Sequence, residues 1–279
     1  MIGVIDVGGG TRGIFGAGVF DWCMDQGISF DYLIGVSAGS ANMTTFLAGQ
    51  RGRNYKFYDE YAFRKEYMSL HNLIFKREYV DLDYIYSTLS NSDGENPMDY
   101  KAFAANPTQM EIVVTNALTG KASYFSKSDI GYDDYDCIKA SCAVPVVCKP
   151  YTVYGVPYYD GGLSDPIPYK RAFEKGCDKL IVILTRPKNM MRDPKKDNRL
   201  EWLTKRRYPK AAEAIHNRAQ VYNTQLREVL QLERQGKALI IAPDDIGDLK
   251  TLTKDHEPLR RLYKKGYSGA AAIPQFLNA

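Results

Sequence analysis

The chain has 279 residues, of which 44% are hydrophobic and 25% are charged, and its formal net charge is +4. This composition is typical of a soluble globular protein, and the length suits one large α/β domain. The small net charge predicts no nucleic-acid partner, because it offers little attraction for a polyanion. No apolar run approaches the ~20 residues that span a bilayer.

The first residues and the cysteines predict the cellular location of the protein. Met1 leads straight into a strand-like run, without the basic and apolar segments of a secretory signal. The five cysteines include no Cys-x-x-Cys pair, and the three histidines stand far apart in the chain. We therefore expect free buried thiols, a cytoplasmic location and no bound metal. Nothing in the sequence indicates an oligomeric state.

The first fifty residues alternate short apolar runs with helical patterns. Strands are expected over 2–7 and 30–36, and helices over 11–26 and 38–47. Short loops between strand and helix predict a parallel sheet with right-handed crossovers.

Residues 51–100 differ in character, since they are polar, charged and rich in tyrosine. Helical pieces with aromatic faces are expected there. Such a region is either a layer that covers the sheet or a wall that faces a substrate, and the sequence leaves both open.

The remaining chain predicts further strands and helices of the same domain. Hairpins are expected over 111–125 and 153–159, helices over 135–143, 168–175 and 211–235, and strands over 179–185 and 238–242. Residues 186–209 are basic and are predicted to be irregular. The end of the chain, after Asp255, is expected to be helical. We expect one domain over 1–279, with a core of about 1–185 and an extension over about 186–279.

Three consecutive glycines follow the first strand. Residues 8–13, Gly-Gly-Gly-Thr-Arg-Gly, fit the dinucleotide fingerprint G-x-G-x-x-G, whose bare N–H groups bind a pyrophosphate. That site also needs an acidic residue at the end of the second strand, whereas Asp31 lies at its start. A Walker A loop does not fit either, because no Gly-Lys-Ser/Thr follows. We expect no cofactor and interpret the loop as a set of donors for another anion.

Ser37 lies where that acidic residue is missing. Residues 35–39, Gly-Val-Ser-Ala-Gly, form G-x-S-x-G between a predicted strand and a predicted helix, which is the setting of a nucleophile elbow. The sharp turn strains the serine and exposes its Oγ, and at Gly35 and Gly39 a Cβ would collide with neighbouring segments. The helix N-terminus adds partial positive charge. The alternative is a tight turn in which Ser37 only caps the helix.

A serine hydroxyl needs a base to become a good nucleophile, and three residues are candidates. His216 is expected within the long helix and His256 in a polar stretch, so both are interpreted as surface residues. Asp160 follows an aromatic strand in Asp-Gly-Gly, a pattern that on its own is often only a turn.

Taken together, these motifs resemble the patatin-like phospholipase family of serine acyl hydrolases over roughly residues 1–185. The matches, in order, are residues 8–13 to the G-G-G-x-R-G oxyanion loop, 35–39 to the nucleophile elbow, and 160–162 to the D-G-G/A motif with the catalytic aspartate. Residues 140–145 are similar to the family's small-residue segment. The chain departs from the family at Val7, where an acidic residue is frequent, and Asp6 is interpreted as structural.

The resemblance implies a three-layer α/β/α fold with a mainly parallel sheet and a dyad of Ser37 and Asp160. In this dyad Asp160 accepts the proton of Ser37. The glycine loop, Gly8, Gly9 and Gly10, forms the oxyanion hole, with the N–H groups of Gly9 and Gly10 as its main donors. Arg12 either supports this loop or forms a surface salt bridge.

The implied activity is hydrolysis of acyl esters through an acyl-enzyme, as in a phospholipase, lysophospholipase or carboxylesterase. The expected partner is a lipid or other acyl-ester substrate, with only transient, peripheral membrane contact and no nucleic acid. The alternative is a catalytically silent module of the same fold that binds a lipid or a protein. The head group and the acyl-chain length are not specified by the sequence.

Overall fold

A central sheet of eight strands organises the computed structural model, which describes residues 1–278. The strands are β1 (Ile2–Asp6), β2 (Tyr32–Val36), β3 (Gln109–Asn116), β4 (Ala122–Ser126), β5 (Tyr151–Val153), β6 (Val156–Asp160), β7 (Lys179–Ile183) and β8 (Ala238–Ile241). Their order is β5-β6-β3-β2-β1-β7-β8, and β4 pairs with β3. The run β3-β2-β1-β7-β8 is parallel, whereas β4 and β6 are antiparallel to β3.

Both faces of this sheet are buried. Successive side chains of a strand point to opposite faces, and on β1 Val4 and Ile5 belong to two different hydrophobic clusters. Leu33 and Ile34 of β2 divide in the same way. A parallel sheet of this kind must be covered by helices on both sides.

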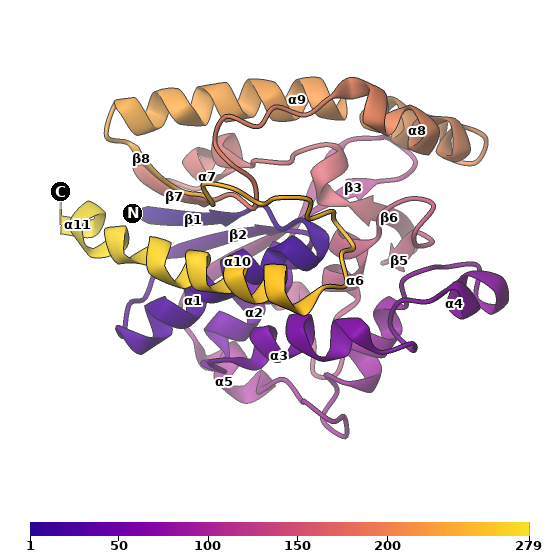
Figure 1. Ribbon diagram of the computed structural model, residues 1–279, viewed down its shortest axis with the longest axis horizontal. Coiled ribbons are helices and arrows are strands. Elements are labelled where there is room, and N and C mark those ends of the chain that lie inside the picture. The colour runs from indigo at the N-terminus through magenta and orange to yellow at the C-terminus, as the bar shows by residue number, and fades with distance from the viewer. Residues whose placement is uncertain (279) are drawn as a thin grey trace.

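The helices supply these two covering layers. They are α1 (Ile14–Asp25), α2 (Ala38–Leu47), α3 (Arg53–Asp59), α4 (Leu70–Phe75), α5 (Tyr100–Ala105), α6 (Asp136–Cys142), α7 (Tyr169–Glu174), α8 (Asn198–Lys205), α9 (Pro209–Arg234), α10 (His256–Gly269) and α11 (Ile273–Asn278). In Figure 1 the long α9 lies above the sheet, and α1, α2 and α10 lie below it. The expected α/β/α fold with a mainly parallel sheet is confirmed. None of these helices is long and apolar enough to cross a bilayer.

Most predicted elements are confirmed, but the segment 186–209 is a correction. It was expected to be irregular, whereas residues 198–205 form α8 and pack against α9. The helical pattern of α8 is weak, because its apolar residues are only Leu200, Trp202 and Leu203. Contact with α9 supplies the stability that this local sequence lacks.

The C-terminal extension completes the same sheet. β8 pairs with β7 in parallel register, and α10 lies along α1. The two helices touch at glycines: a Cβ on Gly18 would lie 2.3 Å from the carbonyl oxygen of Tyr263, and one on Gly266 would lie 2.0 Å from that of Phe15. We therefore propose that the core and its extension form one domain.

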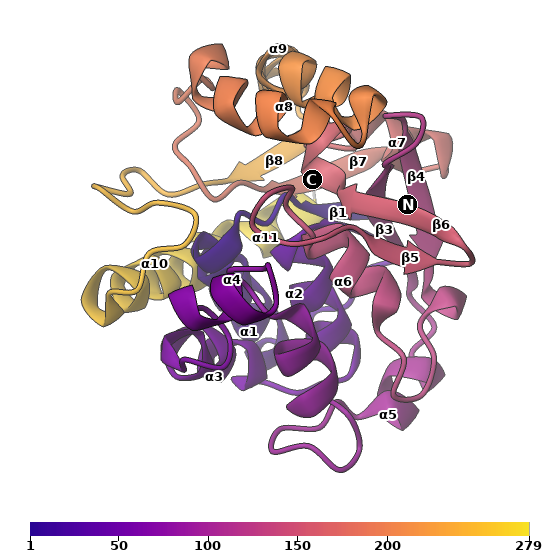
Figure 2. The same cartoon turned by 90° about the vertical axis from the view of Figure 1, so that its right-hand side faces the viewer.

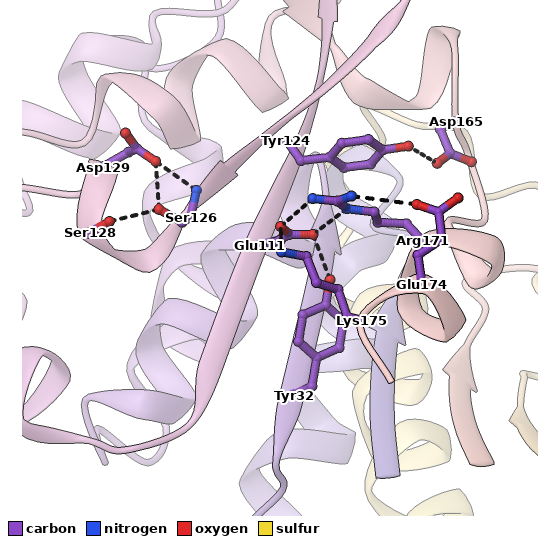
Figure 3. Close-up of polar contacts among 10 residues, drawn as sticks. All are labelled: Tyr32, Glu111, Tyr124, Ser126, Ser128, Asp129, Asp165, Arg171, Glu174 and Lys175. Carbon is purple, nitrogen blue, oxygen red and sulfur yellow. Dashed lines mark hydrogen bonds and ion pairs between the residues drawn. The ribbon is translucent and has the colours of Figure 1, made fainter. Parts of the chain in front are cut away.

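A buried acidic residue fastens α7 to the amino-terminal ends of β2 and β3 (Figure 3). The carboxylate of Glu111 accepts two hydrogen bonds from Arg171, each 2.8 Å long, and lies 2.9 Å from Nζ of Lys175. The Tyr32 hydroxyl donates to it at 2.8 Å. We call these four residues the Glu111 cluster. Burial raises the pKa of Glu111, but the hydrogen bonds from its partners outweigh burial and hold it below its usual value.

Candidate active site

Ser37 and Asp160 come together because two strands end against the same neighbour. Val36, the last residue of β2, pairs with Val113 of β3, and Asp160, the last residue of β6, pairs with Val114. Since the other edge of β3 is occupied by β4, β2 and β6 meet end to end along one edge. Ser37 and Asp160 both line the cavity that lies there.

The backbone of Ser37 has the strained conformation that a nucleophile elbow requires. Its φ is 56° and its ψ is −132°, values that non-glycine residues rarely adopt. A Cβ on Gly35 would lie 2.5 Å from Cα of Ser40, and one on Gly39 would lie 2.2 Å from the carbonyl oxygen of Asp6. Both glycines of the motif are therefore required by close contacts between β1, β2 and α2.

Ser141 holds the elbow in place. Its hydroxyl accepts a hydrogen bond from the N–H of Ser37 at 2.8 Å and donates to the carbonyl oxygen of Val113 at 2.7 Å. The sequence singles out residues 140–145 only by their small size. A hydroxyl between the elbow and β3 is the physical reason that a small polar residue fits there.

The glycine loop turns sharply beside the elbow. Gly8, Gly9 and Gly10 have φ values of 61°, 131° and 61°, which residues other than glycine rarely adopt. The N–H of Gly8 donates to the buried carboxylate of Asp6 at 2.9 Å, which agrees with the structural interpretation of Asp6. Within residues 1–278, the N–H groups of Gly9 and Gly10 have no acceptor. They are therefore the donors of this loop that remain available to an anion.

Asp160 is almost fully buried, with 3% of its surface exposed. Burial raises the pKa of its carboxyl, while the Arg218 guanidinium and the Ser37 side chain oppose that rise. The carboxylate also accepts a hydrogen bond from the N–H of Gly162 at 2.8 Å. A carboxylate in this setting is a stronger base than one in water.

The cavity around these residues has a volume of about 350 Å³. One part of its wall is aromatic and aliphatic, with Tyr58, Tyr67 and Tyr86 from the tyrosine-rich region. These three tyrosines of residues 51–100 line the cavity, and their contact with a substrate stays a prediction. Other tyrosines of the region are not part of this wall, and Tyr61 is buried in a separate hydrophobic cluster.

Five arginines line the cavity. Arg53 lies over the ring of Phe57 in the aromatic part, and the other four form what we call the arginine cluster: Arg12, Arg186, Arg192 and Arg218. Only Arg12 is identified from the sequence. It is 4% exposed and in no ion pair of the described chain, so the surface salt bridge is wrong. Arg186 and Arg192 lie in the segment 186–209, of which the sequence indicates only that it is basic. Arg218 lies on α9. The signal that the sequence offers is a basic segment directly after β7, which neighbours β1.

Neither histidine candidate joins Ser37. His216 lies on the exposed face of α9 near Glu201, and the ring of His256 stacks on Phe63. Neither belongs to the cavity wall. Cys142 does, and burial raises the pKa of its thiol to about 12. All five cysteines are free, as expected.

Comparison with known proteins identifies families for two parts of the chain. Residues 7–173 match the family described as patatin-like phospholipase, and residues 208–278 match a family described as a domain of unknown function, DUF6363. The second match covers α9, β8 and the C-terminal helices α10 and α11.

Individual relatives share moderate sequence similarity. Uncharacterized protein YjjU of Escherichia coli is 29% identical over 82% of this chain and 64% of its own length. Lysophospholipase NTE1 of Yarrowia lipolytica is 25% identical over 65% of this chain and 12% of its own length. The crystal structure of VipD from Legionella pneumophila aligns at 15% identity with a TM-score of 0.49, over 99% of this chain and 66% of that one.

The chain therefore spans less than two thirds of the length of these curated relatives. The first family match nevertheless covers more than half of the chain and includes the glycine loop, the elbow and the Asp-Gly-Gly motif. The chain belongs to the patatin-like phospholipase family.

Proposed function

We propose that this protein is a serine lipid acyl hydrolase in which Ser37 is the nucleophile and Asp160 the base. The observation that carries the proposal is the meeting of β2 and β6 on one edge of β3, beside the glycine loop. It joins a strained serine, a buried carboxylate and free N–H donors in one cavity. These are the parts that acyl transfer needs.

The proposed reaction has two steps. In the first, Asp160 takes the proton of Ser37 as its Oγ attacks the ester carbonyl, and the alcohol leaves with that proton. In the second, water attacks the acyl-enzyme and releases the acid. The N–H groups of Gly9 and Gly10 bind the oxyanion, and removing one such donor typically costs ~3 kcal/mol of transition-state stabilisation. Gly8 contributes to the oxyanion hole by shaping the loop, since its own N–H is bonded to Asp6.

The aromatic part of the cavity is the proposed acyl pocket. Besides the three tyrosines it includes Phe57, Val80, Leu82 and Ile85. An apolar wall of this size suits a fatty acyl chain, which supports a lipid ester as the substrate.

Peripheral contact with a lipid surface is supported by exposed apolar residues on two helices. Leu70, Ile74 and Phe75 of α4 and Trp202 of α8 are each at least 69% exposed. Both helices lie on the side of the molecule that faces the viewer in Figure 2. Lys76 and Arg77 directly follow α4, and basic residues beside apolar ones favour an anionic bilayer surface.

The test combines a fluorophosphonate label with ester hydrolysis. We expect the protein to be labelled and to hydrolyse a p-nitrophenyl acyl ester. Ser37→Ala should abolish the label, and both Ser37→Ala and Asp160→Asn should lower kcat by roughly 10³-fold or more. Ser128→Ala, an exposed serine outside the cavity, is the matched control. Hydrolysis near the wild-type rate in Ser37→Ala would rule out the proposed mechanism.

The alternative is a catalytically silent module that binds a lipid or a protein. It predicts binding to lipid vesicles with no fluorophosphonate label and no hydrolysis. Buried Asp160 and the strained Ser37 both argue against it, because a binding module has no need for either feature.

A further inference from the structure

The arginine cluster carries more positive charge than the protein balances. Its four guanidinium groups face two carboxylates, Asp160 in the cavity wall and the buried Asp197. Asp160 is the only acidic residue that lines the cavity within residues 1–278. Buried charges are normally paired, so an excess of cations at a cavity indicates a site for an anion.

The contacts of the individual arginines support this conclusion. Nε of Arg12 is buried without a hydrogen-bond partner in the described chain, and its Nη1 reaches only the carbonyl oxygen of Leu249 at 3.4 Å. Arg192 approaches Asp197 at 3.3 Å, and Arg218 approaches the same carboxylate at 3.9 Å. Arg186 makes no ion pair among the described residues. Several N–H donors therefore remain free for a ligand.

The guanidinium groups of the cluster also repel one another electrostatically. Burial and the neighbouring guanidinium groups lower the pKa of Arg12 to about 9 and that of Arg218 to about 10. Burial and Arg192 lower the pKa of Arg186 as well. Arginine side chains stay protonated at neutral pH. Their mutual repulsion therefore destabilises the protein without ligand, and a bound anion would reduce it.

The cluster lies beside the atoms proposed to react. Nη2 of Arg12 is 3.4 Å from the position of a Cβ on Gly9, and Nε of Arg218 donates to the carbonyl oxygen of Gly162 at 2.8 Å. Arg186 follows Thr185, whose hydroxyl donates to the carbonyl oxygen of Gly8. An anion bound among these arginines would lie a few bonds from an ester carbonyl held between Ser37 and the glycine loop.

We propose that the arginine cluster binds the phosphate of the substrate, a phosphate monoester a few bonds from the acyl ester, as in a 1-acylglycerol 3-phosphate. This deepens the proposed function and rests on it. Guanidinium groups bind phosphate in bidentate fashion. A phosphocholine head group is disfavoured at this cluster, because the guanidinium groups around the phosphate repel its ammonium group. Arg186, Arg192 and Arg218 lie outside residues 7–173, so this preference comes from the extension of the patatin core.

The test compares three short-chain esters with one acyl chain: 1-acylglycerol, its 3-phosphate and its 3-phosphocholine. We expect the wild-type protein to hydrolyse the 3-phosphate with a kcat/KM at least tenfold above the other two. Arg186→Gln and Arg192→Gln should lower this ratio at least tenfold, mainly through KM, and Arg186→Lys should restore part of it. Arg199→Gln, an exposed arginine outside the cavity, is the matched control and should leave the ratio unchanged.

Each other outcome separates the two proposals. Hydrolysis of all three esters with equal kcat/KM overturns the phosphate site and leaves the serine hydrolase intact. Competitive inhibition by inorganic phosphate without any preference among the esters also overturns it, since the cluster would then bind a free anion only. If the wild-type protein shows neither the fluorophosphonate label nor hydrolysis of any ester, the proposed function itself is wrong.

Discussion

Two groups of buried and partly buried charges lie at opposite ends of the same sheet and are built differently. The Glu111 cluster lies at the amino-terminal ends of β2 and β3, and the arginine cluster lies beyond the carboxyl-terminal ends of β1 and β7. In the first, Glu111 meets Arg171 and Lys175 at 2.8 and 2.9 Å. In the second, the shortest ion pair is 3.3 Å long and joins Arg192 to Asp197.

This difference separates a structural role from a functional one. In the Glu111 cluster both cations reach the carboxylate within 2.9 Å, and these close ion pairs fix α7 against the sheet (Figure 3). Charges of one sign without close counter-ions lower the stability of the fold, and such charges are common where they serve binding or catalysis. Removing a charge should therefore have opposite effects on stability in the two clusters.

The largest effect is expected at Glu111. Glu111→Gln leaves Arg171 and Lys175 without their shared counter-ion, and both are only partly exposed to water. Removing one partner of such a pair should destabilise the protein by about 2–3 kcal/mol, which denaturant unfolding measures. Glu174→Gln is the control: this exposed acid lies 3.5 Å from Arg171 and should contribute less than about 0.5 kcal/mol.

The pH dependence of unfolding provides a second test of the contribution of Glu111 to stability. Since the pKa of Glu111 is lowered in the folded protein, its contribution is fully present above the unfolded pKa of ~4.3. It is lost as the pH falls from that value through the lower, folded pKa. Glu111→Gln should lack this part of the acid destabilisation. An unchanged acid profile in the variant would contradict the role given to Glu111.

Much of the fold could be predicted, because its elements depend on local pattern. The bounds of α2 match the predicted helix over 38–47, and β2 ends at Val36 as expected. The elbow, the glycine loop and the Asp-Gly-Gly motif were recognised because each is contiguous in the sequence. Local chemistry, with glycines at close contacts and a serine at a strained turn, is sufficient for such motifs.

The parts that were missed depend on which strands are neighbours. The role of a basic segment after residue 185 can be inferred only when β7 is known to pair with β1. This pairing brings Arg186 beside the glycine loop. Arg218 lies on a helix whose sequence periodicity explains it equally well as a surface residue. Its place next to Asp160 follows only from the packing of α9 against the turn Gly161–Leu163, which follows β6.

A smaller effect is expected on the pH profile at Arg218. The Arg218 guanidinium opposes the rise that burial causes in the pKa of Asp160. Arg218→Gln removes this opposition, so the pKa of Asp160 should rise further. Because a proposed base must be deprotonated, the acid limb of kcat/KM should move to higher pH by about one unit, or ~1.4 kcal/mol.

Arg227 supplies the matched control for this shift. It is an exposed arginine on the same helix α9 and lies outside the cavity. Arg227→Gln should keep the acid limb of the wild-type profile. If Arg218→Gln kept it as well, Arg218 would not be a positioning residue for Asp160. The arginine cluster would then not act on the proposed base through Arg218.

The smallest effect, and the one of opposite sign, is expected at Arg186. Arg186→Met removes one of four mutually repelling charges and retains an unbranched side chain, so it should stabilise the protein by about 0.5–1 kcal/mol. The melting temperature should rise by roughly 2 °C, while Arg199→Met should leave it unchanged. Saturating inorganic phosphate should raise the melting temperature of the wild type more than that of Arg186→Met, because only the wild type has the full set of guanidinium groups to neutralise. A clear loss of stability in Arg186→Met would place the arginine cluster with the Glu111 cluster as a structural feature, because a charge that stabilises the unliganded fold is already compensated by the protein.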